Sequence, residues 1–156
     1  MKKYLFLLYG IISYLAFFGT ILYAIGFVGN LVVPKTIDGE PQTSLAAAVL
    51  INASLLLLFA LQHSIMARPA FKRWWTRMIP KELERSSFVL LSSLCLMLLM
   101  WQWQPVGGIV WSVESKTAKD LLFIFYLAGW GIVFISTFLI NHFDLFGLRQ
   151  VWLYFN

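Results

Sequence analysis

Charged residues are scarce in this sequence: they make up 12% of its 156 residues, whereas hydrophobic residues make up 60%. A soluble domain is about half apolar and about a quarter charged, so a soluble fold of this size would have more apolar surface than its core could hide. The single cysteine, Cys95, excludes an internal disulfide, and its position among Leu and Met residues predicts a buried thiol that packs rather than reacts. The composition therefore indicates a membrane protein.

Four long apolar runs dominate the sequence. A helix needs about 20 apolar residues to cross the hydrocarbon core, and these runs do not alternate in polarity as the strands of a membrane barrel do. The predicted spans cover residues 4–28, 45–67, 87–103 and 121–140. We predict an all-α fold, an integral membrane four-helix bundle that residues 1–156 form as one domain, with short links making successive helices antiparallel.

The first run is predicted to be a retained signal anchor. Its apolar part is far longer than the roughly 7–15 residues of a cleaved signal peptide, and no small-x-small cleavage site closes it. Within the run, Ala16, Thr20 and Ala24 recur at four-residue spacing, which predicts a close approach to another helix.

The net charge of +5 is interpreted as an orientation signal, and no nucleic-acid partner is predicted. Most basic residues precede the first run, follow the fourth or lie between the second and third: Lys2, Lys3, Arg68, Lys72, Arg73, Arg77, Lys81, Arg85 and Arg149. The two alternate loops hold only Lys35, Lys116 and Lys119. The positive-inside rule then predicts that both termini are cytoplasmic.

The loop between the second and third runs, "ARPAFKRWWTRMIPKELERS", interleaves aromatic and basic residues. Pro69 and Pro80 bracket one short helix, because proline suits the first turn of a helix and not its interior. We predict that this helix lies in the inner membrane interface, with tryptophan at headgroup depth and the basic side chains facing anionic lipid.

Polar side chains gather at the ends of the spans that this topology brings to the cytoplasmic surface. They are Gln62, His63, Ser64, Glu84, Arg85, Asn141, His142, Asp144, Arg149 and Gln150. If the fourth helix continues past residue 140, His142 and Arg149 share a face, and Asn141 and Asp144 lie on another. Such residues either form a site or merely cap and anchor helix ends, and both interpretations remain open.

Several chemistries are compatible with this set of side chains. His63, His142 and either Asp144 or Glu84 would suffice by count for a two-histidine-one-carboxylate iron site, but no local ligand spacing supports it. A haem held between the two histidines is also conceivable. No phosphate loop, nucleophile elbow or zinc motif is present, so no metal is predicted.

Three segments resemble the membrane-bound methanethiol S-methyltransferases: "LQHSIMARPAFKRWW", "PKELERSSFVLLSSLCLMLLMWQWQP" and "GWGIVFISTFLINHFDLFGLRQVW". That family is related to the isoprenylcysteine carboxyl methyltransferases. The resemblance covers residues 62–152 and extends more loosely through the first run. It implies methyl transfer from S-adenosylmethionine to methanethiol, giving dimethyl sulfide. With the topology predicted from the charges, we expect a multi-pass protein of the inner membrane whose site faces the cytoplasm.

The resemblance also suggests roles for the polar residues. His63, His142, Arg85 and Arg149 are of a type to position a thiol or favour its thiolate. The remaining members would form a rim around substrate and cofactor: Gln62, Ser64, Glu84, Asn141, Asp144 and Gln150.

The sequence departs from the family pattern at its carboxyl end. Family members are longer, and their cofactor-binding signature, an Arg-His-Pro element followed by further helices, has no counterpart here. The apolar end "VWLYF" is typical of a surface that another segment covers. We therefore predict a missing cofactor-binding part or a partner subunit. The alternatives are a non-catalytic membrane scaffold or a haem-binding four-helix protein.

Overall fold

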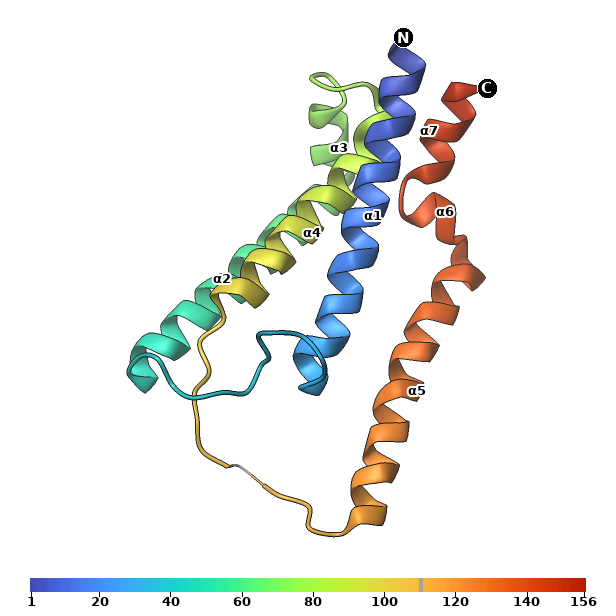
Figure 1. Cartoon of the computed structure of the whole chain (residues 1–156). Helices are drawn as coiled ribbons and strands as arrows, with labels where there is room; N and C mark the ends of the chain where they lie inside the picture. Colours follow the sequence, from blue (N-terminus) through green and yellow to red (C-terminus); the bar gives the residue numbers. More distant parts are fainter. Residues whose placement is uncertain (110) are drawn as a thin grey trace.

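The computed structural model describes residues 1–109 and 111–156, and the secondary structure of that part is helical (Figure 1). The long helices are α1 (Lys2–Gly29), α2 (Leu45–Ala67), α4 (Glu84–Gln102) and α5 (Lys116–Ile140). The short ones are α3 (Pro69–Trp75), η1 (Lys81–Leu83), α6 (His142–Leu145) and α7 (Leu148–Phe155). Four helical stretches are long and apolar enough to cross a membrane, with η1 and α4 forming the third. The predicted all-α fold with four spans is confirmed.

The helix boundaries follow from capping residues that hydropathy does not detect. Helix α5 begins at Lys116, not at residue 121, because the Ser115 hydroxyl accepts a hydrogen bond from the Ala118 amide at 3.4 Å. Ser44 caps α2 in the same way. Helix α4 begins at Glu84, three residues before its predicted start, directly after η1.

Helix α4 is the centre of the packing, because it contacts both α1 and α2. Two clusters of buried side chains form the core: Ala24, Phe27, Leu99 and Met100 in one, and Met66, Phe88 and Val89 in the other. Thr20 and Ala24, two of the small residues predicted to allow close helix packing, are buried. Cys95 is half-buried in α4.

Helix α5 is set apart from this packed group, as Figure 1 shows. None of its residues, 116–140, is buried. Its Tyr126 hydroxyl donates a hydrogen bond to the backbone oxygen of Ile25 in α1. The four spanning helices are therefore unevenly packed, with three in close contact and the fourth lying along one side.

The two termini and α3 lie at the same end of the molecule, and the loop between α1 and α2 lies at the other (Figure 1). Successive helices therefore run in opposite directions, and the predicted gathering of polar residues at one surface depends on this arrangement. The predicted short helix between Pro69 and Pro80 is present as α3, with Pro69 in its first turn.

The apolar carboxyl end packs along α1. Val151 is fully buried, and a Cβ atom on Gly10 of α1 would lie 2.5 Å from its Cγ2. Tyr154 stacks on Phe6 with ring centroids 5.0 Å apart. Trp152 remains 55% exposed. Helix α1 thus covers one face of the end that was predicted to need a partner, and the other face stays open.

Candidate functional site

The chain bends sharply where α5 ends, and this bend places the predicted polar residues. Asn141 has φ 129 and stops α5 at Ile140, and its side-chain oxygen accepts a hydrogen bond from the Asp144 amide at 3.3 Å, which starts α6. Helix α5 therefore ends at residue 140, where the predicted span ends, and the condition under which His142 and Arg149 would share a helix face is not met. We call residues 141–150 the elbow.

The elbow docks on the amino-terminal turn of α4. The Arg85 Nε donates to the backbone oxygen of Leu145 at 2.7 Å, and the Ser86 hydroxyl donates to that of Gly147 at 3.3 Å. Gly147 has φ +85, and a Cβ atom there would lie 2.7 Å from both the Ser86 nitrogen and its hydroxyl oxygen. Glycine is required here because both the backbone conformation and the close approach exclude a side chain.

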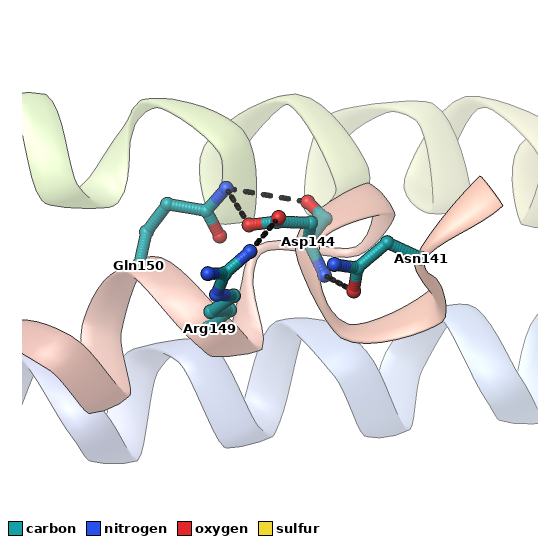
Figure 2. A network of polar contacts seen from close by, with 4 residues as sticks. All are labelled: Asn141, Asp144, Arg149 and Gln150. Carbon is teal, nitrogen blue, oxygen red and sulfur yellow. Dashed lines mark hydrogen bonds and ion pairs between the residues drawn. The ribbon is translucent and has the colours of Figure 1, made fainter. Parts of the chain in front are cut away.

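Figure 2 shows four of the predicted residues brought together in the elbow: Asn141, Asp144, Arg149 and Gln150. Arg149 Nη1 lies 2.5 Å from Asp144 Oδ2, and Gln150 Nε2 donates to Asp144 Oδ1 at 3.2 Å. With the Asn141 cap, these contacts fix α6 relative to α7. Within this network the positive charge of Arg149 is paired with the negative charge of Asp144, and this ion pair is partly exposed.

His142 is buried, with 3% of its surface exposed, and both of its ring nitrogens have partners. Nδ1 lies 2.7 Å from the Thr137 hydroxyl, and Nε2 lies 2.8 Å from the Tyr14 hydroxyl of α1. Because Thr137 donates its own proton to the Phe134 backbone oxygen at 2.7 Å, it accepts from Nδ1–H, and Tyr14 then donates to Nε2. This hydrogen-bond pattern indicates a neutral imidazole ring that carries its proton on Nδ1. Consistently, burial lowers the pKa of His142.

His63 is placed differently, because it is exposed beside a cavity and near Arg85. Its Nδ1 lies 3.3 Å from the Ser92 hydroxyl. The Phe88 ring contacts both side chains, with its centroid 5.0 Å from that of the His63 ring and 5.0 Å from the Arg85 guanidinium carbon. Of the four predicted catalytic residues, His63 and Arg85 are the pair that the fold brings to one cavity.

We call this space the His63 cavity; its volume is about 410 Å³. Helices α2 and α4 contribute most of its polar groups, and α1 contributes one more, Thr20. The lining comprises Phe17, Thr20, Ile21, Phe59, His63, Ala67, Arg85, Phe88, Val89, Ser92, Ser93, Leu96, Leu145 and Phe146. An apolar cavity with a few convergent polar groups is suited to a small, largely apolar ligand with one polar atom.

A second, more polar cavity of about 520 Å³ lies under the elbow, and Arg85 lines both. Its other lining residues are Lys72, Lys81, Glu82, Glu84, Asp144, Gln150 and Leu153. Lys72 and Glu84 form an ion pair at 3.7 Å. We call this the elbow cavity. It offers amines and carboxylates, and its lining contains no aromatic side chain.

The remaining predicted residues are peripheral. The Gln62 amide nitrogen lies 3.1 Å from the Met66 sulfur, and Ser64 is exposed at the end of α2. Asn52 of α2 pairs with the backbone of Gln104 through two hydrogen bonds of 2.7 and 2.9 Å. It therefore joins α2 to the end of α4.

The geometry argues against the iron and haem alternatives. In residues 1–109 and 111–156, no three His, Cys, Asp or Glu side chains are grouped as metal ligands would be. A haem between the histidines would also have to displace one of the two hydrogen bonds to His142.

Three residues of the site were not predicted from the sequence: Tyr14, Ser92 and Thr137. Each is a polar side chain within a span, where unsatisfied polar groups are costly. A search for polar residues inside the spans, and not only at their ends, would have found them.

The fold and these cavities define a multi-pass helical membrane protein with room for a small ligand between its helices. The chain is 55% identical over 149 residues to the methanethiol S-methyltransferase of Crocosphaera subtropica, covering 96% of this chain and 58% of that protein. It is 50% identical over 153 residues to the methanethiol S-methyltransferase of Mycobacterium tuberculosis, covering 98% and 63%. It is 32% identical over 115 residues to nurim of Mus musculus, covering 70% and 44%.

The resemblance predicted from the three motifs is confirmed by these identities. The chain spans 52–63% of the length of the first methanethiol S-methyltransferases that it matches. No family model matches the chain, and no solved structure does.

Proposed function

We propose that this chain is the thiol-binding part of a membrane thiol S-methyltransferase that converts methanethiol into dimethyl sulfide, with S-adenosylmethionine as the methyl donor. The observation that carries the proposal is the pairing of His63 and Arg85 at one apolar cavity, in a chain about half identical to proteins of that name. The relatives' name supports the reaction, and the cavity supports the ligand class.

In this proposal the thiol binds in the His63 cavity with its sulfur near His63 and Arg85. The thiolate is the nucleophilic form of a thiol. If His63 donates its Nδ1 proton to Ser92, its Nε2 is left to accept the proton of the thiol. The Arg85 guanidinium stabilises the resulting negative charge in an apolar setting, where a charge interaction is stronger than in water.

S-adenosylmethionine would supply an electrophilic methyl group on a sulfonium. The thiolate sulfur would form its bond to that methyl group as the donor's S–CH3 bond breaks, and S-adenosylhomocysteine would leave. The elbow cavity has amines and carboxylates of the kind that hold an amino-acid group, but no aromatic side chain to pack on the adenine base. The elbow cavity alone therefore does not offer a complete site for this donor. We propose that the donor-binding part is supplied by a segment outside these 156 residues or by a partner subunit.

His142 and Arg149 have a different proposed role. The hydrogen bonds of His142 to Tyr14 and Thr137, and the ion pair of Arg149 with Asp144, occupy the polar groups that a substrate would need. We propose that both residues position the elbow and do not contact the thiol. The other predicted rim residues of the elbow act in the same network.

The proposed location is the inner membrane, with the elbow and both termini facing the cytoplasm. The supporting observation is that the termini and α3 lie at one end of the helices, together with most of the basic residues. The spanning helices face lipid. The exposed Trp74 of α3 fits an interfacial position.

The test is a methyl-transfer assay in lipid nanodiscs, with dimethyl sulfide measured by gas chromatography. We expect no product from the chain alone, and product when it is fused to the part of the Crocosphaera relative that the match leaves uncovered. In the active fusion, His63→Ala should lower kcat by about 10²-fold or more, the range for losing a general base.

Arg149→Lys is the matched control for Arg85→Lys, because both variants keep a positive charge. Arg85→Lys should lower kcat/KM strongly, since lysine cannot reproduce the planar guanidinium. Arg149→Lys should leave kcat/KM within about twofold, as expected for a partly exposed ion pair. An inactive fusion that folds and binds neither thiol nor donor would favour the scaffold alternative.

A further inference from the structure

The His63 cavity extends far along the helices that line it. Its lining on α4 runs from Arg85 to Leu96, which is roughly 16 Å at the rise of about 1.5 Å per residue of an α-helix. Methanethiol has only one carbon and one sulfur atom, whereas a volume of about 410 Å³ lies in the range of pockets that hold drug-sized ligands. The cavity therefore has much more room than methanethiol fills.

The polar groups of this cavity are not spread evenly along it. Two of its hydroxyls donate to their own helices: Ser93 donates to the backbone oxygen of Val89 at 2.8 Å, and Thr20 donates to that of Ala16 at 2.6 Å. These hydroxyls therefore offer a ligand no free donor. The polar groups that remain belong to the site proposed for the thiol sulfur.

Beyond that site the cavity continues for about one helical turn and becomes apolar. Phe59 lies one turn before His63 in α2, and Leu96 lies one turn after Ser92 in α4, which is about 5–6 Å further from the end of the molecule that holds the termini. Phe59 and Leu96 also pack against the same core cluster. We call Phe59 and Leu96 the deep end of the cavity.

We propose that the substrates of this cavity include alkyl and aryl thiols whose apolar body is about one helical turn long, such as butanethiol, and not methanethiol alone. The inference rests on the proposed thiol methyl transfer. The sulfur would lie beside His63, and the alkyl group would extend to the deep end. His63 would take the thiol proton, the sulfur would bond to the donor's methyl group as the donor's S–CH3 bond breaks, and an alkyl methyl sulfide and S-adenosylhomocysteine would leave.

The expected preference follows from the burial of apolar surface. Each methylene group that moves from water into an apolar space tightens binding by about threefold to fourfold. The deep end offers such a space, because its side chains are a phenylalanine and a leucine. Affinity referred to the free concentration in water should therefore rise from the methyl to the butyl member of a series of ligands.

The test measures occupation of the cavity in this chain and needs no turnover. In a Cys95→Ser background, Ser93→Cys places a single thiol on the cavity lining, and Leu57→Cys places one at an exposed position of α2 outside it. Methyl methanethiosulfonate labels either thiol in nanodiscs, and intact mass gives the rate. Ile21→Cys, also on the lining, replaces Ser93→Cys should that buried thiol not be labelled. Dimethyl sulfide, ethyl methyl sulfide and butyl methyl sulfide are the unreactive competitors.

The free concentration of competitor that halves labelling at Ser93→Cys should fall by roughly tenfold or more from dimethyl sulfide to butyl methyl sulfide. Leu57→Cys should not be protected. Leu96→Trp fills the deep end and should remove most of the gain of the butyl compound while leaving dimethyl sulfide nearly unchanged. Leu96→Phe replaces it should the larger side chain prevent folding. Leu94→Trp is the matched control, because Leu94 is exposed on the same helix and does not line the cavity, and it should keep the parental gain.

The substrate class itself is tested in the active fusion. Butanethiol should give butyl methyl sulfide with a kcat/KM at least as high as that for methanethiol. Conversion of methanethiol without conversion of butanethiol would overturn the proposal, because the space beyond the sulfur would then be taken by the donor or by the added segment.

The labelling experiment overturns the proposal in any of four ways. They are equal half-protecting concentrations for the methyl and butyl sulfides, a Leu96→Trp variant that keeps the gain, a Leu94→Trp variant that loses it equally, and equal protection at Leu57→Cys. Protection that behaves as expected in a chain whose fusion methylates neither thiol would leave the ligand class of the cavity in place and refute the methyl transfer. The two failures are therefore distinguishable.

Discussion

Gly147 is the residue on which the docking of the elbow depends most directly. An alanine there must adopt φ near +85, a left-handed conformation that costs an L-residue about 1–2 kcal/mol. Its Cβ would also lie 2.7 Å from the Ser86 nitrogen and hydroxyl oxygen, well inside the roughly 3.5–4.0 Å of a normal contact. The overlap involves backbone, so the elbow has to move away from α4.

Moving the elbow breaks its two hydrogen bonds to α4. The bond from the Arg85 guanidinium to Leu145 is worth about 1.5–3 kcal/mol and that from the Ser86 hydroxyl to Gly147 about 0.5–1.5 kcal/mol. With the conformational cost, Gly147→Ala should lower the free energy of unfolding by about 3 kcal/mol or more. The measurement is unfolding in mixed micelles by circular dichroism, with amide hydrogen exchange over residues 142–147.

Substitutions at two other glycines separate the conformational cost from the cost of the close approach to Ser86. Gly108 also has a positive φ, +75, but a Cβ there meets nothing within 4 Å, so Gly108→Ala should cost only the conformational term of about 1 kcal/mol. Gly131 is helical and faces open space, so Gly131→Ala should be neutral or stabilising by up to about 1 kcal/mol. If Gly147→Ala costs no more than Gly108→Ala, the close approach to Ser86 does not hold the elbow.

Three further predictions concern the buried polar groups. Asn52→Ala should cost about 2–3 kcal/mol of stability, seen as a lower unfolding midpoint, because it removes both hydrogen bonds to the Gln104 backbone; Asn52→Gln, which cannot keep both, should not restore it. Tyr14→Phe should cost about 1–3 kcal/mol, because the buried Nε2 of His142 loses its donor while the ring packing remains. Since burial lowers the pKa of His142, the elbow should be stable above the ordinary histidine pKa of about 6.5 and should loosen as the pH falls below it. Hydrogen exchange of α6 at pH 5 and pH 8 checks this, and a His142→Gln variant with the same pH dependence would refute it.

The four spans could be predicted because the bilayer imposes a length and polarity that hydropathy measures directly. Their ends were harder to predict, because they depend on single residues. The Ser115 cap starts α5 at Lys116, five residues before the predicted start at residue 121. The positive φ of Asn141 ends the helix. "NHFDLFG" does contain a possible signal, since Asn favours caps and Gly allows positive φ, but the apolar residues between them suit a continuing helix equally well.

The contrast between the two histidines could not be predicted from sequence. Both follow an apolar run and both were predicted to be catalytic. Tyr14, 128 positions before His142, donates to its ring, and Ser92, 29 positions after His63, contacts that ring. Partners this far away in the sequence decide whether both ring nitrogens of a histidine form hydrogen bonds or only one does. Local residue spacing does not encode such partners.

Arg85 connects the fold and the proposed chemistry, because different parts of one side chain serve each. The Nε of its guanidinium anchors the elbow through Leu145, and the Cζ of the same group lies over Phe88 at the wall of the His63 cavity. Anything that shifts the elbow therefore also shifts the positive charge that we propose for the thiolate. The same shift moves Phe146, whose ring stacks on Phe17 of α1 with centroids 3.8 Å apart. The position of the elbow thus sets where the proposed positive charge lies at the wall of the His63 cavity, which explains why a short bend with few buried residues carries so many specific contacts.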